Sequence, residues 1–311
     1  MKYRPLGTTS LKVSEVGFGA WAVGGNKYGN SYGPTDDVES RAAIHRAIEL
    51  GCNFFDTADV YGLGHSEELL GEVLSEYQED MIIATKVGSN FYQPHTAMDF
   101  SAAYLQFAVE QSLTRLRRER IDVCQLHNPP LGLIESGEIF RVMEKLRQQG
   151  KIRHYGVAVS TLEEALAVVK NRMSQVIQVV YNIFNQSAAV HLFPRAEEAG
   201  IGIIAREPLF SGFLTGKYSP NSTFPPGDIR YNWPRQYVAS LSETVRTLSF
   251  LDKPGGRTMA QASIRFVLDN DAVSVVIPGA KNVAQVEENM AVSEMSPLAA
   301  EEMSRLAVFR K

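Results

Sequence analysis

The sequence predicts an α/β fold, a (β/α)8 TIM barrel with an N-terminal β-hairpin and extra C-terminal helices, formed by residues 1–311 as a single domain. Three observations predict this class. Eight short apolar runs alternate with longer segments at helical spacing. Many of the runs are β-branched and unbroken by polar residues, as buried parallel strands require. The length of 311 residues fits an α/β barrel that carries insertions.

The elements follow from a short hairpin over residues 2–13, with its turn at residues 7–10. The eight β-runs are residues 16–22, 53–57, 81–86, 121–127, 152–159, 176–181, 202–206 and 272–278. The helical segments are residues 36–50, 65–78, 101–119, 136–149, 161–171, 187–199, 236–250 and 258–270, followed by 282–292 and a tail helix at 297–309. Two long loops remain, at residues 22–35 and 209–234.

Local signals mark some of the helix ends. Ser160 with Glu163 has the spacing of a capping box. Gly51, Gly150 and Gly200 each follow a helical segment, where a left-handed residue is favoured. We therefore expect one helix to begin after Ser160 and three helices to end just before these glycines.

A doubly wound, dinucleotide-binding sheet is the competing fold. Gly17, Gly19 and Ala22 fit the pattern G-x-G-x-x-A, and Asp36 and Asp37 lie about twenty residues further on. That pattern requires a helix to start at its last position, so that the phosphates meet the helix N-terminus. The next residues here are VGGNKYGNSYGPT, a loop that cannot continue as a helix. The barrel is therefore favoured.

Composition and charge exclude several classes of protein. The chain is 44% hydrophobic and 21% charged, which supports a large core and argues against disorder. It carries 31 Lys and Arg against 35 Asp and Glu, a net charge of −4. No global basic field attracts nucleic acid, and the basic cluster at residues 115–120 closes a predicted helix, where cations complement the helix dipole.

No segment predicts a membrane anchor or a secretory signal. No apolar run approaches the roughly 18 residues of a membrane span, and the N-terminal residues lack the apolar stretch of a signal peptide. Cys52 and Cys124 lie in apolar β-like runs, which fits reduced core thiols. We expect a soluble cytoplasmic protein with no nucleic-acid or membrane partner.

Four residues at or just after the ends of successive β-runs are candidates for catalysis: Asp56, Tyr61, Lys86 and His127. The carboxyl ends of neighbouring barrel strands meet at one face, where ligands bind, so we expect these side chains to converge. Each alone has an ordinary structural explanation, such as an Asp before a turn. An ion inside a barrel needs a partner, however, and the four together favour a site.

The set has the chemistry of a proton donor with tuning groups. The pKa of a free tyrosine is about 10, and the Lys86 ammonium is expected to lower the pKa of Tyr61 by stabilising its phenolate. Asp56 is expected to pair with Lys86, and His127 to hydrogen-bond the substrate oxygen. A metal site does not compete for His127, because Cys124, three residues earlier on a strand, points to the opposite face.

Longer stretches of the sequence resemble the aldo-keto reductase superfamily, and within it the bacterial and potassium-channel β-subunit-like branch. The resemblance runs from the hairpin to about residue 292 and is carried by FFDTADVYGLGHSEELLG, IIATKVG, RIDVCQLHNPP, GKIRHYGVAVSTLEEA, REPLFSGFLTGKY and VIPGAKNVAQVEEN. It implies NADPH-dependent reduction of an aldehyde or ketone to an alcohol by direct hydride transfer. It also implies that Tyr61 is the general acid and that Asp56, Lys86 and His127 complete a catalytic tetrad.

The resemblance further implies an NADPH molecule extended across the barrel mouth, with NADH as the alternative cofactor. Ala20 and Trp21 would border the nicotinamide and the substrate, Gln178 would bond the carboxamide, and Asp56 would contact the cofactor as well as Lys86. The residues that would wrap the pyrophosphate are Leu209, Ser211, Gly212, Leu214 and Lys217. Those that would hold the adenosine end are Gly279, Lys281, Gln285, Glu288 and Asn289.

The residues themselves support two anion sites. Ser211-Gly212 and Gly216-Lys217 offer backbone amides and a cation in the long loop after the seventh run. Lys281, in PGAK at the start of a helix, suits the 2′-phosphate of the adenosine ribose. An ordinary glycine turn with an exposed lysine would have the same sequence.

One departure from the family's pattern concerns the carboxamide contacts. Where the family has Ser and Asn after the fifth strand, this chain has Ala158 and Val159. Gln178 must therefore carry more of that task, or Ser160 and water molecules must substitute.

Two further departures concern charge. Arg206 stands where many relatives place an aromatic ring against the nicotinamide, and its planar guanidinium can stack instead. Gln285 stands at the usual arginine position near the adenosine phosphate, which leaves Lys281 as the main cation. NADPH is therefore favoured over NADH but not required.

Aromatic residues on loops at the functional end could form the pocket for a small-molecule carbonyl substrate, or could equally pack the loops down. They are Trp21, Tyr28, Tyr32, Phe91, Tyr92, Tyr231 and Trp233. The sequence identifies neither the carbonyl compound nor the oligomeric state.

Two other functions stay open. One is a regulatory or redox-sensing subunit that binds NADPH with slow or no turnover. The resemblance to the potassium-channel β-subunit-like branch suggests it. The other is a barrel lyase or isomerase that uses the same Tyr and Lys without a nicotinamide, and this function predicts no NADPH binding.

Overall fold

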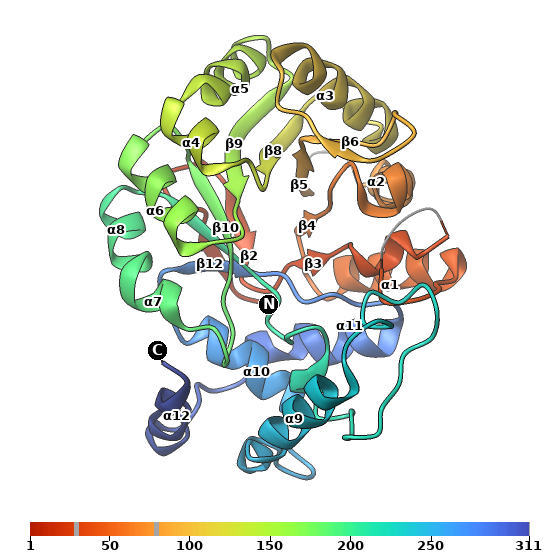
Figure 1. Ribbon diagram of the computed structural model, residues 1–311, viewed down its shortest axis with the longest axis vertical. Coiled ribbons are helices and arrows are strands. Elements are labelled where there is room, and N and C mark those ends of the chain that lie inside the picture. Colours follow the sequence, from red (N-terminus) through yellow and green to blue (C-terminus); the bar gives the residue numbers. More distant parts are fainter. Residues whose placement is uncertain (28–30, 78–80, 311) are drawn as a thin grey trace.

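The computed structural model describes residues 1–27, 31–77 and 81–310, and its centre is a ring of eight parallel strands (Figure 1). The strands are β3 (Phe18–Gly19), β4 (Phe54–Asp56), β5 (Ile82–Val87), β8 (Ile121–His127), β9 (Ile152–Ala158), β10 (Val176–Val180), β11 (Gly202–Arg206) and β12 (Val273–Val276). They pair in the order β12-β11-β10-β9-β8-β5-β4-β3. Parallel bridges from Val16 to Val276 and from Gly19 to Gly279 join the first strand to the last. The predicted (β/α)8 barrel is confirmed.

Helices surround this ring, as Figure 1 shows. They are α1 (Asp37–Glu49), α2 (His65–Leu74), α3 (Ala102–Leu116), α4 (Leu131–Ser136), α5 (Glu138–Gln148), α6 (Leu162–Asn171), α7 (Ser187–His191), α8 (Phe193–Glu198), α9 (Arg235–Arg246), α10 (Met259–Leu268), α11 (Val283–Met290) and α12 (Ala300–Leu306). Short 3-10 turns are η1 (Ala22–Gly24), η2 (Tyr61–Gly64), η4 (Phe213–Thr215), η5 (Ser249–Leu251), η6 (Ala291–Glu294) and η7 (Ala307–Phe309).

Alternate residues of each strand point into the barrel, because successive side chains of a strand lie on opposite faces. The apolar cluster in the barrel interior consists of Leu6, Leu11, Val13, Phe54, Ile82, Ala84, Val123, Val176, Ile204, Val275 and Ile277. Residues next to these in the chain, such as Phe55 and Cys124, belong instead to the larger cluster shared with the helices. The inward positions that continue toward the carboxyl ends of the strands therefore carry the residues of the barrel mouth.

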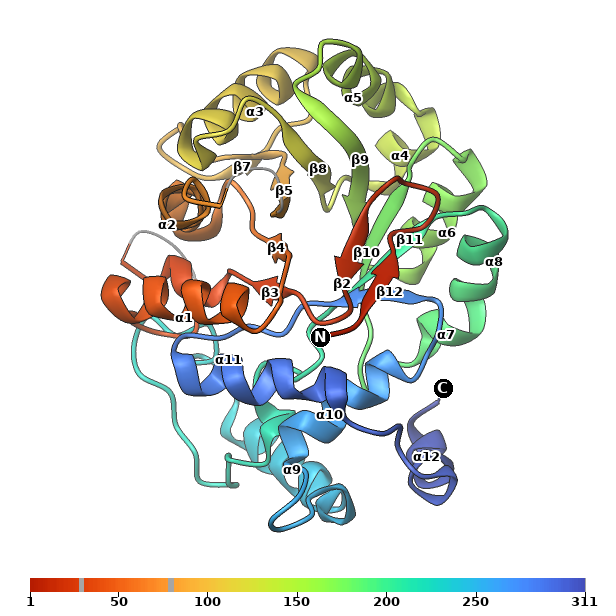
Figure 2. The same cartoon turned by 180° about the vertical axis from the view of Figure 1, so that it is seen from behind.

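The N-terminal hairpin closes the opposite end of the barrel. Its strands β1 (Tyr3–Pro5) and β2 (Lys12–Ser14) pair antiparallel, and Figure 2 shows them lying across the barrel as seen from behind. Three of the interior apolar residues, Leu6, Leu11 and Val13, come from this hairpin. The predicted hairpin is confirmed, and its apolar residues fill this end of the barrel interior.

Several predicted helices end earlier than expected or are divided. The segment predicted at 187–199 is split into α7 and α8, because Pro194 near the start of α8 has no N–H with which to continue α7. The segment predicted at 136–149 begins instead with Gly137 in a left-handed conformation (φ 71°), which separates α4 from α5. The antiparallel pair β6 (Ser89–Asn90) and β7 (Ala97–Met98) had no signal in the sequence.

The capping box of α6 lies one residue later than predicted. The Thr161 side chain accepts a hydrogen bond from the Glu164 backbone N–H, and the Glu164 side chain accepts one from the Thr161 N–H. The pair Ser160 and Glu163 is therefore wrong, since two overlapping S/T-x-x-E patterns occur here and the sequence does not distinguish them. Gly51, Gly150 and Gly200 do follow helices with positive φ, as predicted.

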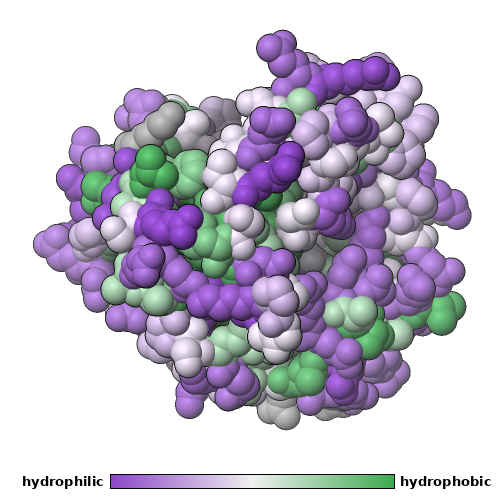
Figure 3. Space-filling model, turned by 90° about the horizontal axis from the view of Figure 1, so that it is seen from below, coloured by the Kyte–Doolittle hydropathy of each residue, from purple (hydrophilic) through white to green (hydrophobic). Residues whose placement is uncertain are grey.

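One face of the molecule is largely polar. Figure 3 shows a face on which hydrophilic side chains dominate and hydrophobic ones form small separate groups. Within the described ranges, no helix combines the length and the apolar character that crossing a membrane demands. The tail helix α12 is held to the body by Glu302, which accepts hydrogen bonds from Arg257 and pairs with Lys253.

The turn of the N-terminal hairpin gives a test of this packing. Gly7 has φ +55°, and a Cβ there would lie 2.3 Å from the backbone nitrogen of Gly202. We expect Gly7→Ala to lower the free energy of unfolding by about 3 kcal/mol or more, because the left-handed strain adds to a clash with backbone. Gly150→Ala is the control, since Gly150 has φ +75° but no atom within 4 Å of its Cβ position, and we expect it to cost only about 1 kcal/mol. Urea unfolding measures both, and equal losses would contradict the packing argument.

Candidate active site

The mouth of the barrel holds a cavity of about 1020 Å³, at the upper end of the roughly 300–1,000 Å³ range of small-molecule sites. Asp56, Tyr61 and His127 line it, and the Lys86 ammonium lies just beneath, with the side chain 1% exposed. The four side chains come from the ends of β4, β5 and β8 and from the turn after β4. The structure thus brings together the four residues that the sequence singled out.

Tyr61 reaches this position through a tight turn. It begins η2, and the next residue, Gly62, has φ +61°. A Cβ on Gly62 would lie 2.4 Å from the carbonyl oxygen of Gly24 in η1. Because only glycine fits this contact, the turn packs directly on the first loop and holds the Tyr61 ring at the edge of the cavity.

The Lys86 ammonium is the hub of the site. An ammonium has three N–H donors, and Lys86 Nζ donates to Asp56 Oδ1 at 2.5 Å, to the Thr57 carbonyl oxygen at 2.9 Å and to Tyr61 Oη at 3.3 Å. Every donor of the buried ammonium is therefore satisfied. The Tyr61 oxygen accepts from Lys86, while its own O–H has no acceptor among the described residues.

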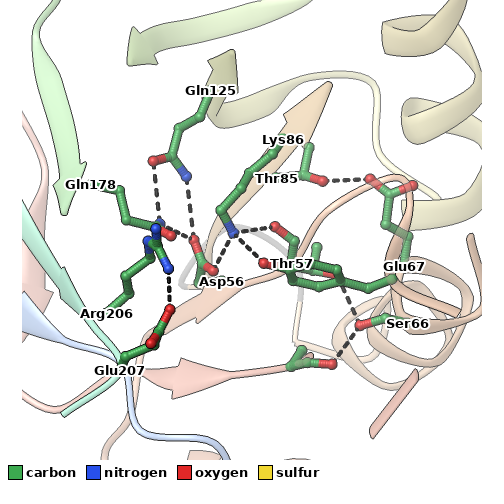
Figure 4. Close-up of polar contacts among 12 residues, drawn as sticks. Asp56, Thr57, Ser66, Glu67, Thr85, Lys86, Gln125, Gln178, Arg206 and Glu207 are labelled. Carbon is green, nitrogen blue, oxygen red and sulfur yellow. Dashed lines mark hydrogen bonds and ion pairs between the residues drawn. The ribbon is translucent and has the colours of Figure 1, made fainter. Parts of the chain in front are cut away.

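Asp56 has partners on its other oxygen as well. Figure 4 shows Lys86, Gln125 and Gln178 converging on its carboxylate. Gln178 Nε2 donates to Asp56 Oδ2 at 2.7 Å and to Gln125 Oε1 at 3.2 Å, and Gln125 Nε2 donates to Asp56 Oδ2 at 3.3 Å. Both N–H groups of Gln178 are thus engaged, which leaves its Oε1 as an acceptor.

The pKa of Tyr61 corrects one expectation. Burial raises the pKa of Tyr61 above its ordinary value, and this effect exceeds the lowering by the Lys86 ammonium. The expected lowering by Lys86 is present, but the expectation that the pKa of Tyr61 falls below its ordinary value is wrong, because burial outweighs it. Burial also acts on Lys86, but the charge of Asp56 raises the pKa of Lys86 above its usual value. At neutral pH the phenol keeps its proton and the lysine its charge.

His127 is uncharged in this environment. Burial, together with the positive charges of Lys86 and Arg206, lowers the pKa of His127 to about 3. Its ring meets the Tyr61 ring edge to face, with ring centroids 5.9 Å apart. Nδ1 of His127 is buried and has no hydrogen-bond partner in the described part of the chain. A neutral imidazole has one N–H group and one bare nitrogen. His127 can therefore donate a hydrogen bond to a ligand or accept one from it.

A second polar network supports the strand ends from behind. Thr85, the neighbour of Lys86, donates to Glu67 on α2 at 2.5 Å, and Arg115 on α3 donates to the other Glu67 oxygen at 2.7 Å. Ser66 joins the same helix to the first strand by donating to the Ala20 carbonyl oxygen at 2.8 Å. Helices α2 and α3 are thereby tied to the strands that carry the tetrad. Figure 4 shows the contacts that Ser66 and Glu67 of α2 make.

The loop after β11 has an unusual backbone. Glu207, Phe210 and Ser211 have positive φ although none is glycine, and Gly212 follows with φ 83°. Strain of this kind concentrates at functional sites. The N–H groups of Ser211 and Gly212 have no hydrogen-bond partner within the described ranges. Successive free amides form a nest for an anion.

Most of the residues expected to hold the cofactor line the cavity. They are Trp21, Asp56, Gln178, Arg206, Leu209, Ser211, Gly212, Lys217, Gly279, Lys281, Gln285, Glu288 and Asn289. Ala20 and Leu214 do not, because both side chains are fully buried in the core. The residues that follow them in the chain, Trp21 and Thr215, line the cavity instead.

Two long loops meet across the cavity. The Ile229 N–H donates to the Ser31 carbonyl oxygen at 3.0 Å. Arg230 forms a buried ion pair with Asp228 at 2.7 Å, and its guanidinium lies 4.8 Å from the centroid of the Tyr32 ring. We call residues 31–34 with 228–230 the strap. Sequence reasoning missed Arg230, whose partner two residues earlier was the only signal.

Lys281 is attached to this strap. Its Nζ donates to the carbonyl oxygens of Tyr32 at 2.6 Å and Pro34 at 3.2 Å, and burial lowers the pKa of Lys281 below its usual value. Gln285 Oε1 accepts a hydrogen bond from the Lys281 backbone N–H at 2.9 Å. Lys217, which also lines the cavity, is exposed.

The expected aromatic wall is only partly present. Trp21 and Tyr32 line the cavity with ring centroids 4.9 Å apart, and Tyr28 lies outside the described residues. The others are not part of the lining, namely Phe91, Tyr92, Tyr231 and Trp233. Trp233 stacks instead on Phe213 with ring centroids 5.7 Å apart, Phe91 stacks on Tyr92 at 4.5 Å, and Tyr231 is exposed. Hydrophobicity alone did not separate the two roles.

Further lining residues were not expected from the sequence. They include Thr96, Glu207, Phe210 and Tyr218. Gln125, the extra partner of Asp56, could have been found, because it alternates with Val123 and His127 on the inward face of β8. Cys124 faces the helices, away from His127. Among the described residues no group of three or more His, Cys, Asp and Glu side chains is arranged to hold a metal ion.

Comparison with known proteins gives consistent matches over nearly the whole chain. The model of the Aldo/keto reductase family matches residues 15–310. An uncharacterized oxidoreductase of Bacillus subtilis, YqkF, is 32% identical over 98% of this chain and 95% of its own. A probable voltage-gated potassium channel subunit beta of Arabidopsis thaliana is 30% identical over 96% of this chain and 93% of its own. The holo form of aldo-keto reductase AKR11C1 from Bacillus halodurans superposes with a TM-score of 0.81 at 30% identity, over 99% of this chain and 96% of that one.

The Asp56–Lys86 pair can be tested by its effect on stability. We expect Asp56→Asn and Lys86→Met each to lower the free energy of unfolding by about 3–5 kcal/mol, because each leaves a buried charge without its counter-ion. The double variant is expected to lose less than the sum by at least about 2 kcal/mol, because it leaves no unpaired charge. Urea unfolding of the four proteins gives the coupling energy. Additive losses would mean that the two charges do not depend on each other.

Proposed function

Because the chain belongs to the aldo/keto reductase family and is an oxidoreductase of that type, we propose that it reduces the carbonyl group of a small aldehyde or ketone to an alcohol with NADPH. The observation that carries the proposal is the state of the Tyr61 hydroxyl. Lys86 donates to its oxygen, whereas its own hydrogen has no acceptor in the described residues and lies at the cavity. A buried phenol of this kind is ready to donate a proton to a bound oxygen.

Tyr61 and His127 supply the chemistry at the carbonyl oxygen. A carbonyl oxygen between them accepts a hydrogen bond from the phenol and one from the neutral imidazole. As negative charge develops on that oxygen, Tyr61 transfers its proton to it, and the Lys86 ammonium at 3.3 Å stabilises the resulting phenolate. Asp56 keeps Lys86 charged and in place. The raised pKa of Tyr61 ensures that the proton is present across neutral pH.

The cavity has donors and acceptors that fit NADPH. The unpartnered amides of Ser211 and Gly212 suit the pyrophosphate, and the Lys281 ammonium suits the 2′-phosphate. The Oε1 atom of Gln178 is free to accept from the carboxamide N–H, since both of its own N–H groups are used. Bound along these residues, the cofactor would supply the hydride for the carbonyl carbon.

An alternative function is supported by the potassium-channel relative. A regulatory or redox-sensing subunit would bind NADPH at the same residues and turn over slowly or not at all. The two functions differ in turnover and not in cofactor binding, so one assay separates them. A lyase or isomerase without a nicotinamide would differ from both in failing to bind NADPH.

The role of Tyr61 gives the first test. We expect Tyr61→Phe to reduce the turnover of carbonyl substrates by about 10²–10⁴-fold, because the proton donor is lost, while NADPH affinity stays within a few-fold. The loss of NADPH absorbance with a panel of small aldehydes and ketones measures turnover, and quenching of protein fluorescence measures affinity. Tyr104→Phe is the control, because Tyr104 donates to the Ser89 carbonyl oxygen away from the cavity. Wild-type protein that binds NADPH but reduces none of the panel would support the regulatory function instead.

The cofactor assignment gives a second test. We expect Lys281→Met to weaken NADPH binding by about tenfold, through the loss of a charged hydrogen bond to the 2′-phosphate, and to change NADH binding little. Lys217→Met is the matched control, since a lysine beside the pyrophosphate contacts a group that both cofactors share and should weaken both alike. Titration by protein fluorescence gives the four affinities. An equal effect of Lys281→Met on NADPH and NADH would exclude a 2′-phosphate contact.

A further inference from the structure

An ion pair on the cavity wall is unused by the proposed chemistry. Arg206 is the last residue of β11, and Glu207 follows it in a left-handed conformation with φ 57°. The Arg206 guanidinium bonds the Glu207 carboxylate, and both residues line the cavity that also contains Tyr61, His127 and Gln178. Figure 4 shows the pair beside Gln178. Because removing two charges from water costs free energy, a charge pair in a partly buried cavity calls for a functional explanation.

The position of Arg206 is fixed by a second contact. Its Nη2 donates to the backbone carbonyl oxygen of Val159 at 3.2 Å. The Val159 side chain is 2% exposed and packs in the outer core, so this residue offers the cavity side only its carbonyl. The Ser160 hydroxyl does not compete with Arg206 for the Val159 carbonyl oxygen, because it donates to Asn128 Oδ1. Arg206 therefore occupies the wall next to Gln178, on the neighbouring strand.

The charges around the tetrad do not cancel equally. Asp56 and Lys86 form a closed pair beneath the cavity. In the second pair the Arg206 side chain is 23% exposed and the Glu207 side chain 34%, so water screens the carboxylate more than the guanidinium. After burial and the Lys86 ammonium, the positive charge of Arg206 also acts to lower the pKa of both Tyr61 and His127. The reactive end of the cavity therefore has a positive field.

Such a field distinguishes the two redox states of a nicotinamide. The reduced ring is uncharged, whereas the oxidised ring carries a positive charge. We propose that Arg206 makes this site select the cofactor by redox state, binding NADPH more tightly than NADP⁺, and that Glu207 limits the preference. The inference rests on the proposed function, since it requires the nicotinamide to lie beside Gln178. An uncharged aromatic ring at position 206 would give no such selection.

The preference has a consequence for turnover. Repulsion between Arg206 and the oxidised ring weakens the binding of the spent cofactor and speeds its release, while leaving the affinity for the fresh cofactor unchanged. A site of this kind is suited to reduction in the presence of accumulated NADP⁺. Arg206 acts here as a specificity residue and not as a proton donor, because a guanidinium keeps its proton at all ordinary pH values.

The test is the ratio of two dissociation constants, Kd for NADP⁺ over Kd for NADPH, at one pH and one ionic strength. We expect Arg206→Gln to lower this ratio by about tenfold, since it removes the charge, and Glu207→Gln to raise it, since it removes the compensating carboxylate. Arg206→Lys keeps the charge but loses the planar group, so it is expected to preserve the ratio even if both affinities fall. Isothermal titration calorimetry gives all the constants without any turnover.

The possible results separate the inference from the proposed function. Opposite shifts for Arg206→Gln and Glu207→Gln, with the ratio preserved in Arg206→Lys, support redox selection. A ratio that stays within twofold in Arg206→Gln, or that falls in both neutral variants, overturns it while NADPH binding itself stands. Wild-type protein that binds neither cofactor overturns the proposed function and the inference with it. A purely structural role of Arg206 would weaken both cofactors equally and leave the ratio unchanged.

Discussion

A charged lysine buried in a barrel is tolerated only if each of its N–H groups has an acceptor. Lys86 satisfies this condition with three oxygens that lie on or just after β4 and in the turn that follows it, those of Asp56, Thr57 and Tyr61. The contacts that make its burial tolerable therefore also hold the phenol at the cavity. Gln125 and Gln178 complete the arrangement, since both donate to the second carboxylate oxygen of Asp56. The geometry of the mouth follows from the need to satisfy one ammonium.

The sequence predicted the floor of the site, formed by Asp56 and Lys86, because these residues lie at the ends of successive β-runs whose carboxyl ends meet at one face. Side chains two apart share a face, so the inward positions that hold Phe54 and Ile82 lower in the barrel carry Asp56 and Lys86 near its mouth. What the sequence could not supply was the balance of burial against charge. The neighbouring ammonium was visible in the sequence, whereas the burial that raises the pKa of Tyr61 depends on how the turn after β4 packs against η1.

The wall of the site was less predictable than the floor, because it is built by loops. An aromatic residue on a loop can face a ligand or pin the loop down, and only the packing decides. Tyr32 lines the cavity, with the Arg230 guanidinium over its ring. Trp233, which also lies on a long loop, stacks on Phe213 instead. Helix limits failed for a similar reason. A proline such as Pro194 was visible, but whether it would begin a new helix or end the old one depended on its neighbours.

The departures from the family's pattern on this wall are physically connected. Where the resemblance implies an asparagine at position 159, this chain has a valine whose side chain packs in the outer core, so only its carbonyl oxygen remains available. An aromatic ring at position 206 could not donate to that oxygen, but Arg206 can, and the donation places its charge beside Gln178. The Glu207 carboxylate then offsets part of a charge that the cavity would otherwise hold alone. The Val159 carbonyl is the acceptor for Arg206, and Glu207 is its counter-ion. These departures therefore form one change, in which an anchored ion pair replaces neutral polar contacts.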